Sequence, residues 1–589
     1  MCGIVAYAGE RPAAELLYSG LEKLEYRGYD SAGITTLCDG KFQTVKHGGR
    51  VLKLKEYIPF MRGRVGIGHT RWATHGEAND LNAHPHSCGK FSVVHNGIIE
   101  NYAALKAELI SLGHVFLSET DSEVVAHLLD YYYDGDVMQA LAKTCSRLKG
   151  CWALAILCRD TEGFVAVSRG SPVIIGEGEG EYFAASDIPA IADRAGRYCV
   201  LEDGDCAVVT PSRCIIYDGE FKEAHRAFVP VESDFSDGLK DDCPHYMLQE
   251  IRCNARTIRA TCQKFGFAAD AEKLFLRLHG ADKIVFVGCG TAYNSTLAAK
   301  RLFCGAYGCF VEAVIASEAR YNPPAVTGNS VVIAVSQSGE TADTLKAASI
   351  LKEAGAYLIA VTNTGYSAIT RIADKVLPVC AGSEICVAAT KSYTGQLACF
   401  HLMASLPDFS ERSRELLKVA DEVEKLAFDK EFSSKIAELC VASRAVFFIG
   451  RGGDADVATE AALKLKEVSY IFSDGYPAGE LKHGTLALID EDVLSVVIIC
   501  DEALAEKSKT AVEQILSRRG KVALVTTLPE VYSELDERVS AAWLLPHVPS
   551  HLAHFVSAEA LQLVAYRAAV LAGRDPDKPR NLAKSVTVE

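Results

Sequence analysis

A duplicated pattern in the second half of the chain is the feature that most constrains the fold. Residues 283–291 (Lys-Ile-Val-Phe-Val-Gly-Cys-Gly-Thr) have the composition of a buried strand that runs into a glycine turn and a helix, and residues 444–452 (Arg-Ala-Val-Phe-Phe-Ile-Gly-Arg-Gly) repeat it. A helix and a further apolar strand follow each copy, the strands at residues 331–335 and 493–500. This alternation predicts two α/β domains, each with a parallel sheet flanked by helices.

The N-terminal part of the chain has a different pattern. Short apolar runs bounded by Gly, Asp and Pro predict strands at residues 3–8, 33–37, 64–68, 91–95, 152–158, 163–168 and 206–209. Helical patterns lie between them at residues 12–24, 102–112, 122–133 and 137–148. Many strands with few helices predict an α+β sandwich of two sheets covered by helices, in the layer order αββα.

The chain is too long for one hydrophobic core, since it has 589 residues. A polar, acidic stretch at residues 227–245 interrupts the pattern and is the predicted linker. We therefore expect an N-terminal domain at residues 2–226, two α/β domains at residues 246–425 and 426–575, and a C-terminal tail at residues 576–589.

Composition excludes several classes of partner. The formal net charge of −15 argues against nucleic acid or an anionic membrane as the main partner. The N-terminus has no basic and apolar leader, and no uninterrupted apolar run is long enough to span a membrane. The 20 cysteines contain no Cys-x-x-Cys pair, which fits free thiols in a reducing cytosol. A cytoplasmic protein is the expectation.

Cys2 is the first candidate catalytic residue. Initiator methionine is normally removed before a small residue, so the mature chain is expected to begin with Cys2. A terminal cysteine carries a thiol and an α-amino group on one residue, and the amine titrates close enough to neutral pH to accept the thiol proton. The alternative is a small, buried hydrophobic side chain without a chemical role.

Three polar clusters follow in the N-terminal part, at residues 68–76 with 82–86, at 94–101 and at 119–123. Each has a purely structural alternative. Asn96-Gly97 is a turn signal, and Thr120 with Glu123 forms the pattern of a helix capping box. The histidines in the first cluster do not predict a metal site, because His84 and His86 would alternate between faces of an extended chain and no Cys or carboxylate completes a ligand set.

Together with Cys2, these clusters resemble the class II (N-terminal nucleophile) glutamine amidotransferase domain, and the resemblance includes residues 26–33 (Tyr-Arg-Gly-Tyr-Asp-Ser-Ala-Gly). It implies that Arg71 binds the glutamine α-carboxylate and Asp121 the α-amino group. The side chain of Asn96 and the backbone N–H of Gly97 would form the oxyanion hole. The remaining glutamine-binding residues that the resemblance implies are Trp72, Thr74 and His75. Trp72 would also gate an ammonia channel, with simple core packing as the alternative.

In the second half, Ser336-Gln337-Ser338-Gly339-Glu340-Thr341 stands at the carboxyl end of a predicted strand and the start of a helix. Hydroxyls and free N–H groups converge there at a positive helix end, which predicts a phosphate site. One Ser would have been enough for an ordinary helix cap.

Candidate acid–base residues follow in the second copy. Glu460, Lys464 and Glu467 share one face of a predicted helix. A solvated ion-pair stripe is the alternative explanation of this triplet. After one loop comes Gly-Glu-Leu-Lys-His-Gly at residues 479–484, which contains His483.

This set, with residues 579–589 (Pro-Arg-Asn-Leu-Ala-Lys-Ser-Val-Thr-Val-Glu), resembles the glucosamine-6-phosphate synthase family, which joins an amidotransferase domain to two sugar-isomerase (SIS) domains. The resemblance implies that Lys584 forms a Schiff base with the sugar ketone. His483 would assist ring opening, and Glu467 would move a proton between C1 and C2 with Lys464 nearby. The implied sugar-phosphate-binding residues are Cys289, Gly290, Thr291, Ala292, Ser336, Gln337, Ser338, Thr341, Val387, Ala388, Lys391 and Ala583.

The implied reaction converts L-glutamine and D-fructose 6-phosphate to L-glutamate and D-glucosamine 6-phosphate, the first step of hexosamine synthesis, with no cofactor and no metal. A homodimer is expected, in which a His of one subunit serves the other. Ala292, Ala389 and Thr485 depart from the family pattern and bear on the preferred phosphosugar. Two alternatives stay open: an amidotransferase or deglycase for another phosphosugar, and a phosphosugar-sensing regulator, which would need neither Cys2 nor Lys584.

Overall fold

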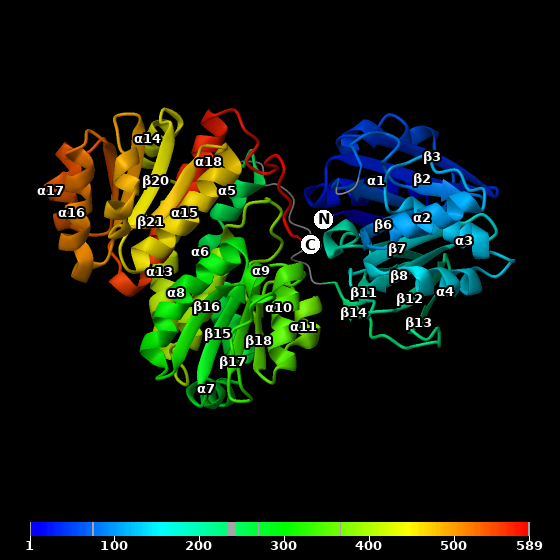
Figure 1. The fold of residues 1–589 in the computed structure, drawn as a ribbon, viewed down its shortest axis with the longest axis horizontal. Helices are drawn as coiled ribbons and strands as arrows, with labels where there is room; N and C mark the ends of the chain where they lie inside the picture. The colour runs from blue at the N-terminus through cyan, green and yellow to red at the C-terminus, as the bar shows by residue number, and fades with distance from the viewer. Residues whose placement is uncertain (1, 74–75, 232–242, 269, 366, 587–589) are drawn as a thin grey trace. The chain divides into compact units, whose positions relative to one another are not determined.

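The computed structural model describes residues 2–73, 76–231, 243–268, 270–365 and 367–586. It divides into two compact units. Unit 1 comprises Met1–Asp237 together with Ala583–Glu589, and unit 2 comprises Gly238–Leu582 (Figure 1).

Unit 1 is built on two antiparallel sheets with the strand orders β14-β11-β9-β10-β1-β4-β2-β3 and β13-β12-β8-β7-β6-β5. The strands of the first sheet are β1 (Gly3–Ala8), β2 (Ser31–Cys38), β3 (Lys41–Gly48), β4 (Val65–Arg71), β9 (Ile174–Gly178), β10 (Glu181–Ala185), β11 (Arg197–Val200) and β14 (Val229–Pro230). Those of the second are β5 (His86–Cys88), β6 (Phe91–Ile99), β7 (Gly150–Cys158), β8 (Phe164–Arg169), β12 (Cys206–Thr210) and β13 (Arg213–Tyr217). β14 falls inside the segment expected to be linker.

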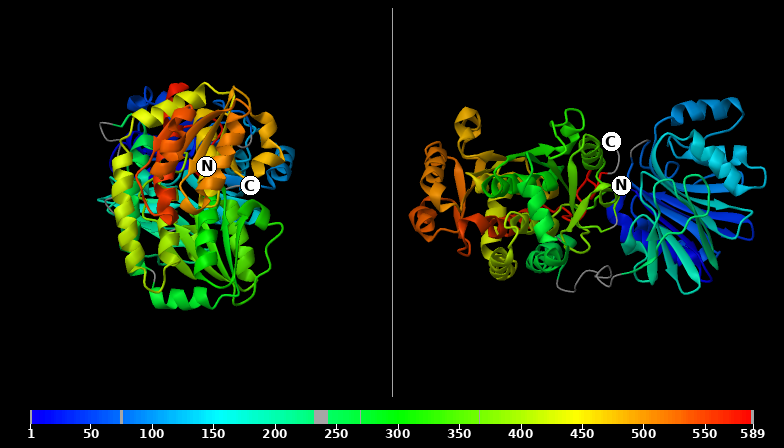
Figure 2. Two further views of the ribbon diagram at one scale, coloured as in Figure 1. Left: turned by 90° about the vertical axis from the view of Figure 1, so that its left-hand side faces the viewer. Right: turned by 90° about the horizontal axis from the view of Figure 1, so that it is seen from below.

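Helices cover the outer faces of both sheets. α1 (Ala13–Leu24) packs on the first sheet, against β1, β4 and β2, while α3 (Glu123–Tyr132) packs on β5 and β6 of the second, with α2 (Tyr102–Ser111) and α4 (Val137–Arg147) beside it. Three apolar clusters fill the spaces: one under α1, one under α2–α4, and one between the sheets. The predicted αββα sandwich is confirmed, and its stacked sheets can be followed in Figure 2.

The strand register determines where the chain begins. β1 lies between β10 and β4, and Gly3 pairs with Thr70. Cys2 therefore lies beside the end of β4, next to Arg71 and Trp72. Gly3 has little space, since a Cβ atom there would lie 2.7 Å from Thr70 Oγ1.

Unit 2 contains two parallel sheets with equivalent strand orders, β16-β15-β17-β18-β19 and β21-β20-β22-β23-β24. Their strands are β15 (Lys283–Gly288), β16 (Phe310–Ile315), β17 (Val331–Ser336), β18 (Tyr357–Thr362), β19 (Lys375–Pro378), β20 (Ala445–Gly450), β21 (Ser473–Pro477), β22 (Val493–Ile499), β23 (Lys521–Thr526) and β24 (Ala541–Leu544). The predicted duplication of an α/β domain with a parallel sheet is confirmed.

The helices that follow the central strands run to opposite sides of each sheet. α8 (Gly290–Ala306) leads from β15 to β16, and α10 (Ala342–Glu353) leads from β17 to β18 on the other side. α15 (Gly453–Ser469) and α16 (Ala505–Leu516) do the same in the second sheet. In such sheets ligands bind outside the carboxyl ends of the strands, at the point where the order reverses.

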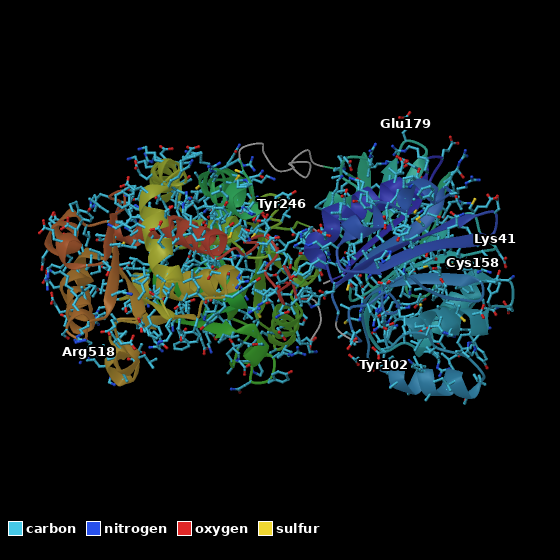
Figure 3. The ribbon with its side chains drawn as sticks, turned by 90° about the horizontal axis from the view of Figure 1, so that it is seen from above. Lys41, Tyr102, Cys158, Glu179, Tyr246 and Arg518 are labelled. Carbon is cyan, nitrogen blue, oxygen red and sulfur yellow. The ribbon has the colours of Figure 1, made fainter. Side chains whose placement is uncertain are left out.

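One apolar core joins the two sheets of unit 2. It is formed largely by α5 (Tyr246–Ile251), α6 (Asn254–Ala268), α12 (Lys391–Met403), α13 (Ser410–Leu426), α14 (Glu431–Val441) and α18 (Ala553–Leu571). The side chains that fill this unit are drawn in Figure 3, where Tyr246 marks the start of α5. Further short helices are α7 (Ala271–His279), α9 (Ala316–Ala319), α11 (Ala368–Ile372) and α17 (Pro529–Leu535). In the described part of the chain, no helix is both long and apolar enough to cross a membrane.

Candidate active sites

The backbone around Cys2 is held from two sides. The N–H of Trp72 donates a hydrogen bond to Cys2 Sγ at 3.3 Å, and the thiol lies 3.6 Å from the Trp72 carbonyl oxygen. The Cys2 carbonyl oxygen accepts hydrogen bonds from Asn96 Nδ2 at 3.0 Å and from Arg27 Nε at 3.3 Å. The half-buried thiol is thereby fixed at the end of β4, beside the predicted glutamine-binding arginine.

The Asn96 side chain has a defined orientation. Its Oδ1 lies 3.0 Å from His69 Nε2, which also contacts the carbonyl oxygen of His95 at 2.9 Å, so His69 Nε2 carries the proton. Burial lowers the pKa of His69 to about 3, and the ring is therefore neutral at physiological pH. The amide nitrogen of Asn96 points towards Cys2 and also donates to Ser186 Oγ at 2.8 Å.

Gly97 belongs to strand β6, as does Asn96, so the alternative interpretation of Asn96-Gly97 as a turn is wrong. Pairing with β7 across the whole segment overrides the local turn preference. Gly97 has φ +119°, and a Cβ atom there would lie 2.1 Å from the Cys151 carbonyl oxygen. Only glycine can adopt this conformation, which sets the direction of its N–H.

Arg71 and Asp121, the predicted partners of the glutamine α-carboxylate and α-amino group, are both buried. Arg71 is buried at the end of β4, where its guanidinium donates hydrogen bonds to the carbonyl oxygens of Gly76 and Glu77, both at 3.2 Å. Burial lowers the pKa of Arg71, while the charges of Cys2 and Asp121 act in the opposite direction. Asp121 is also buried and accepts a hydrogen bond from the Ile99 N–H at 2.8 Å.

The segment at residues 26–33 supports the same strand end. A Cβ atom at Gly28 would lie 2.7 Å from Arg71 C and from Trp72 N, and the Tyr29 ring meets the Trp72 indole edge-on at 5.6 Å between centroids. Thr74 and His75, two of the predicted glutamine-binding residues, lie outside the described residues.

The histidines of the first cluster form a buried stack. The ring centroids of His69 and His84 are 4.1 Å apart, and those of His84 and His86 are 4.6 Å apart. The expectation that His84 and His86 point to opposite faces is therefore wrong. Residues two apart on an extended chain lie on the same face, so the period of a strand would itself bring these two rings together. Burial lowers the pKa of His84 and of His86 well below the usual range, which keeps both rings neutral.

Glu123 does not form the capping box that the sequence suggests. Its carboxylate accepts hydrogen bonds from the N–H groups of Leu117 and Ser118, at 2.9 and 2.7 Å, and from Ser118 Oγ at 2.7 Å. α3 begins at Glu123 itself with Ser122 as the preceding residue, so Thr120 lies too early in the chain to cap the helix. Glu123 instead braces the loop that carries Asp121.

The Ser336–Thr341 loop in unit 2 leads from β17 into α10. Ser336 Oγ contacts Thr341 Oγ1 at 3.0 Å and accepts a hydrogen bond from the Gly339 N–H at 3.0 Å, while Ser338 Oγ accepts one from the Glu340 N–H at 3.1 Å. The serine hydroxyls thus shape the loop as well as offering groups to a ligand. Gly339, with φ +67°, has no room for a side chain because Ser367 Oγ would lie 2.0 Å from its Cβ.

The first turns of α8 and α10 start from the neighbouring strands β15 and β17. Neither helix has a side chain that caps its first turn. Thr344 on α10 donates a hydrogen bond to Cys289 Sγ, before α8, at 3.8 Å. Two positive helix ends at one sheet edge form a suitable site for an anion. The predicted phosphate-binding residues at this edge are Cys289, Gly290, Thr291, Ala292, Ser336, Gln337, Ser338 and Thr341.

A second predicted phosphate-binding segment, residues 387–391, precedes α12. It folds around the buried carboxylate of Glu384, which accepts hydrogen bonds from the N–H groups of Thr390 and Ser392, both at 3.0 Å. Val387, Ala388 and Lys391 are buried. Lys391 Nζ donates to the Ser383 carbonyl oxygen at 2.6 Å, and the Val387 N–H donates to the Asp577 carbonyl oxygen at 3.1 Å.

The predicted acid–base residues meet on one face of α15. Lys464 Nζ lies 2.6 Å from Glu467 Oε2 and 3.5 Å from Glu460 Oε1. The Lys464 side chain is only 1% exposed and that of Glu467 is 21% exposed, so this group is not a solvated surface stripe. Burial alone would lower the pKa of Lys464, but the two carboxylates outweigh it and raise the pKa above its usual range.

The same group reaches across to the first repeat. Thr291 Oγ1 lies 3.0 Å from Glu460 Oε1 and accepts a hydrogen bond from Lys464 Nζ at 2.9 Å, while Asn294 Nδ2 donates to Glu460 Oε2 at 2.7 Å. Burial raises the pKa of Glu460, although Lys464 acts against this. The start of α8, predicted to bind phosphate, is thus bonded directly to the acid–base residues of α15.

The remaining predicted residues are His483, Ala583 and Lys584. His483 is exposed on the short helix η6 (Glu480–His483), and within the described part of the chain no hydrogen bond or ion pair of its side chain is found. Ala583 and Lys584 fall in the C-terminal segment that groups with unit 1. Their position against the residues of unit 2 remains a prediction.

The residues just before that segment are docked on unit 2. The Asp577 carboxylate accepts hydrogen bonds from the N–H groups of Tyr246 and Met247, at 2.8 and 2.7 Å. The Arg580 N–H donates to the Tyr470 hydroxyl at 2.7 Å, and the Arg580 guanidinium lies 4.5 Å from the centre of the Tyr470 ring. Tyr470 directly follows α15, so the tail is anchored next to the helix that carries Glu467.

Several residues of these networks were missed by sequence reasoning. Arg27 is in a recognised motif but received no role, although it bonds to Cys2. Ser186, Asn294 and Tyr470 carry no local signal, because each acts on a partner far away in the sequence.

Comparisons with known proteins agree with both halves of the chain. Residues 69–193 match the glutamine amidotransferase domain family, and residues 277–406 and 440–572 match the SIS domain family. The glutamine--fructose-6-phosphate aminotransferase (isomerizing) of Clostridium tetani is 41% identical over 610 residues, with 100% of both chains covered. That of Caldanaerobacter subterraneus subsp. tengcongensis is 42% identical over 612 residues with the same coverage.

Among solved structures, the C-terminal domain of glucosamine-fructose-6-phosphate aminotransferase from Francisella tularensis is similar to this chain, with a TM-score of 0.51 and 30% identity. The alignment covers 58% of this chain and 100% of that structure. Because relatives at 41% and 42% identity align with the whole chain, this protein belongs to the glutamine--fructose-6-phosphate aminotransferase (isomerizing) family.

Proposed function

We propose that the chain carries out its family's reaction at two separate sites, a glutaminase site at Cys2 in unit 1 and a sugar site around Lys464 in unit 2. Glutamine and fructose 6-phosphate are the substrates, and glutamate and glucosamine 6-phosphate the products. The observation that supports this most strongly is the buried network of Thr291, Glu460, Lys464 and Glu467, which joins a phosphate-binding helix end to a carboxylate and an amine.

At the first site, the Cys2 thiolate attacks the side-chain amide carbon of glutamine, and the α-amino group of Cys2 takes the thiol proton. Arg71 pairs with the α-carboxylate and Asp121 with the α-amino group. The oxyanion that forms is stabilised by Asn96 Nδ2 and the Gly97 N–H, and one such donor contributes about 2.7–4 kcal/mol to lowering the barrier. Ammonia leaves, and water then releases glutamate from the thioester. Trp72, Thr74 and His75 complete this site.

At the second site, the two helix ends and the Ser336–Thr341 loop bind the phosphate, together with Val387, Ala388, Lys391 and Ala583. Lys584 forms an imine with the ketone of the open-chain sugar, and ammonia from the first site displaces it. Glu467 then removes a proton from C1 and delivers it to C2, and the hydrogen bond from Lys464 Nζ holds this carboxylate in position. Ammonia must pass between the sites without meeting water, where protonation would end its nucleophilicity.

We also propose a cytosolic homodimer in which His483 of one subunit opens the sugar ring bound by the other. The exposed position of His483 on η6, with no bond to the Lys464 network among the described residues, supports this arrangement. Cross-linking or mass measurement in solution tests the dimer. Mixed dimers of a His483→Ala chain and a Lys584→Ala chain should regain part of the activity that each variant lacks alone.

Two substitutions test the division into sites. Cys2→Ala should abolish glutamate release and leave fructose 6-phosphate binding unchanged, whereas Cys151→Ser, at an exposed cysteine, should change neither. Lys584→Ala should stop amino-sugar formation while glutamine hydrolysis continues. Product formed at the normal rate by the Lys584 variant, or loss of sugar binding by the Cys2 variant, would contradict the proposal.

A further inference from the structure

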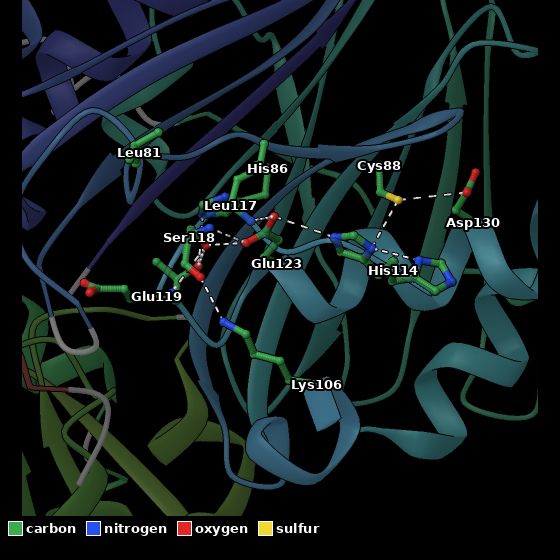
Figure 4. A network of polar contacts seen from close by, with 12 residues as sticks. Leu81, His86, Cys88, Lys106, His114, Leu117, Ser118, Glu119, Glu123 and Asp130 are labelled. Atoms are coloured by element: carbon green, nitrogen blue, oxygen red, sulfur yellow. Dashed lines mark hydrogen bonds and ion pairs between the residues drawn. The ribbon is translucent and has the colours of Figure 1, made fainter. Parts of the chain in front are cut away.

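Outside both candidate active sites, unit 1 brings a thiol and two imidazoles together. Cys88 closes β5, His114 follows α2, and His127 lies on α3. One ligand-type atom from each of the three residues lies within 4.8 Å of the others. Figure 4 shows Cys88, His114 and Asp130 at this point, with Glu123 on the side towards Leu117 and Ser118.

The three atoms converge on a single region. His127 Nδ1 lies 2.9 Å from His114 Nδ1 and 3.2 Å from Cys88 Sγ. Ligands of a tetrahedral zinc ion, at about 2.0–2.3 Å from the metal, are about 3.3–3.6 Å apart. A shift of a few tenths of an ångström would therefore open the cluster enough to admit an ion. The His114 and His127 rings are inclined at 76°, so their in-plane lone pairs can meet at one point.

The surroundings of His127 leave its Nδ1 lone pair available. Glu123 Oε1 lies 3.6 Å from His127 Nε2, on the other side of the ring. The Glu123 carboxylate, fixed by three donors of the preceding loop, attracts the imidazole proton to Nε2. A carboxylate behind a histidine is the usual second shell of a zinc ligand. Phe116 stacks on the same ring at 4.1 Å between centroids, which holds its orientation.

Charge and access also suit a divalent cation. The Asp130 carboxylate lies 3.9 Å from Cys88 Sγ and adds a negative charge beside the cluster. Cys88 and His114 are half-buried, whereas His127 is buried, so an ion could enter from the surface. One thiolate and two imidazoles favour zinc and similar transition metals over magnesium or calcium, which prefer oxygen.

We propose that Cys88 Sγ, His114 Nδ1 and His127 Nδ1 bind a zinc ion, with water in the fourth position. On binding, the thiol proton is released to solvent and the hydrogen bond between the two histidines is replaced by bonds to the metal. The ion would tie the end of β5 to α3 and to the loop after α2. Because Glu123 links His127 to Leu117 and Ser118, the ion would also stiffen the loop that ends at Asp121.

The test measures metal binding and does not depend on enzyme activity. The full chain is prepared in a Cys2→Ala background, so that the N-terminal thiol and amine do not chelate, stripped with a chelator and loaded with Zn²⁺, Co²⁺ or Mg²⁺. We expect one equivalent of Zn²⁺ per chain after desalting, a thiolate-to-cobalt charge-transfer band with Co²⁺, and no retained Mg²⁺. Added Zn²⁺ should also raise the Tm of the stripped chain.

Cys88→Ser should remove the charge-transfer band, and His114→Asn should weaken Zn²⁺ binding at least about tenfold. Both positions are half-buried, so folding should survive, and circular dichroism checks this. Cys38→Ser and His47→Asn are the matched controls in the same unit and should bind Zn²⁺ normally. No retained Zn²⁺, or retention that neither ligand variant reduces, would overturn the proposal and leave a hydrogen-bonded Cys–His–His cluster.

Discussion

Lys464 Nζ on α15 donates a hydrogen bond to Thr291 Oγ1 on α8 at 2.9 Å. Each of these helices follows the first central strand of one copy of the duplicated α/β domain, so this bond joins the two copies. The first copy is predicted to bind phosphate here, and the second to move protons. The Thr291 hydroxyl also lies 3.0 Å from Glu460 Oε1. A single hydroxyl thus sits between a buried cation and a buried anion.

Replacing Thr291 with Val should destabilise this network. Both charged partners are buried and lose a hydrogen bond, so the free energy of unfolding should fall by about 1–3 kcal/mol. Amino-sugar formation should fall as well, while glutamine hydrolysis stays normal. Urea unfolding and separate assays of the two half-reactions check this. Thr291→Ser keeps the hydroxyl and should resemble the parent; equal behaviour of the Val and Ser variants would contradict the account.

Gly97→Ala should impair glutamine hydrolysis. The new Cβ would lie 2.1 Å from the Cys151 carbonyl oxygen, so strand β6 must shift and turn the oxyanion donor away. Loss of one such donor lowers kcat by about 10²–10³. The matched control is Gly113→Ala, since Gly113 also has a positive φ, +93°, but no atom within 4 Å of a Cβ. If both variants lose the same activity, backbone strain and not the oxyanion hole is responsible.

Arg71→Lys should act on glutamine binding more than on chemistry. Lysine keeps the charge but cannot form the paired hydrogen bonds of a guanidinium with a carboxylate. KM for glutamine should rise about 10–100-fold with a smaller change in kcat. Glutamine amidated at its α-carboxylate provides the cross-check. The parent should hydrolyse it slowly, and the Arg71→Lys substitution should reduce that rate only a little further. Additive losses would show that Arg71 does not contact the α-carboxylate.

Much of the fold follows from local sequence signals. The apolar run at residues 3–8 coincides with β1 (Gly3–Ala8), and the helix spacing of Glu460, Lys464 and Glu467 correctly places them on one face of α15. Such patterns are visible because burial acts on neighbouring residues with a fixed period. Thr291, predicted to bind phosphate at the start of α8, also contacts that face.

Contacts between distant segments could not be predicted. Nothing near Thr291 in the sequence indicates that it bonds to α15, and Glu123 follows the pattern of a capping box but bonds to the preceding loop. Cys88, His114 and His127 lie on three separate elements with ordinary spacing, so only their folding together indicates a shared role. Long-range pairing, and not local preference, decides each of these cases.

The pH dependence of stability should show the effect of Glu559, which is buried in α18. Burial raises the pKa of Glu559 to about 8, whereas an exposed glutamate has a pKa of 4.5. Between these two pKa values the folded chain keeps a proton that the unfolded chain has released. The free energy of unfolding therefore falls as pH rises from about 4.5 to about 8.

Glu559→Gln keeps the hydrogen bond that Asn254 Nδ2 donates at 2.6 Å and removes the ionisation. Relative to the parent, the variant should gain stability as pH rises from about 5 to about 8, as measured by urea unfolding at several pH values. Glu537→Gln, at an exposed position, should show no such trend. A parallel pH dependence in the parent and the Glu559 variant would contradict the assignment.

The central claim is that nitrogen released from glutamine in unit 1 is captured by a sugar carbonyl in unit 2. The most direct measurement uses glutamine labelled with ¹⁵N in its side-chain amide, fructose 6-phosphate and unlabelled ammonium in the buffer, with mass spectrometry of the amino sugar. Glucosamine 6-phosphate carrying the ¹⁵N label is the predicted product, and Cys2→Ala should yield none of it. An amino sugar that contains only unlabelled nitrogen, or none at all from the parent protein, would contradict the account.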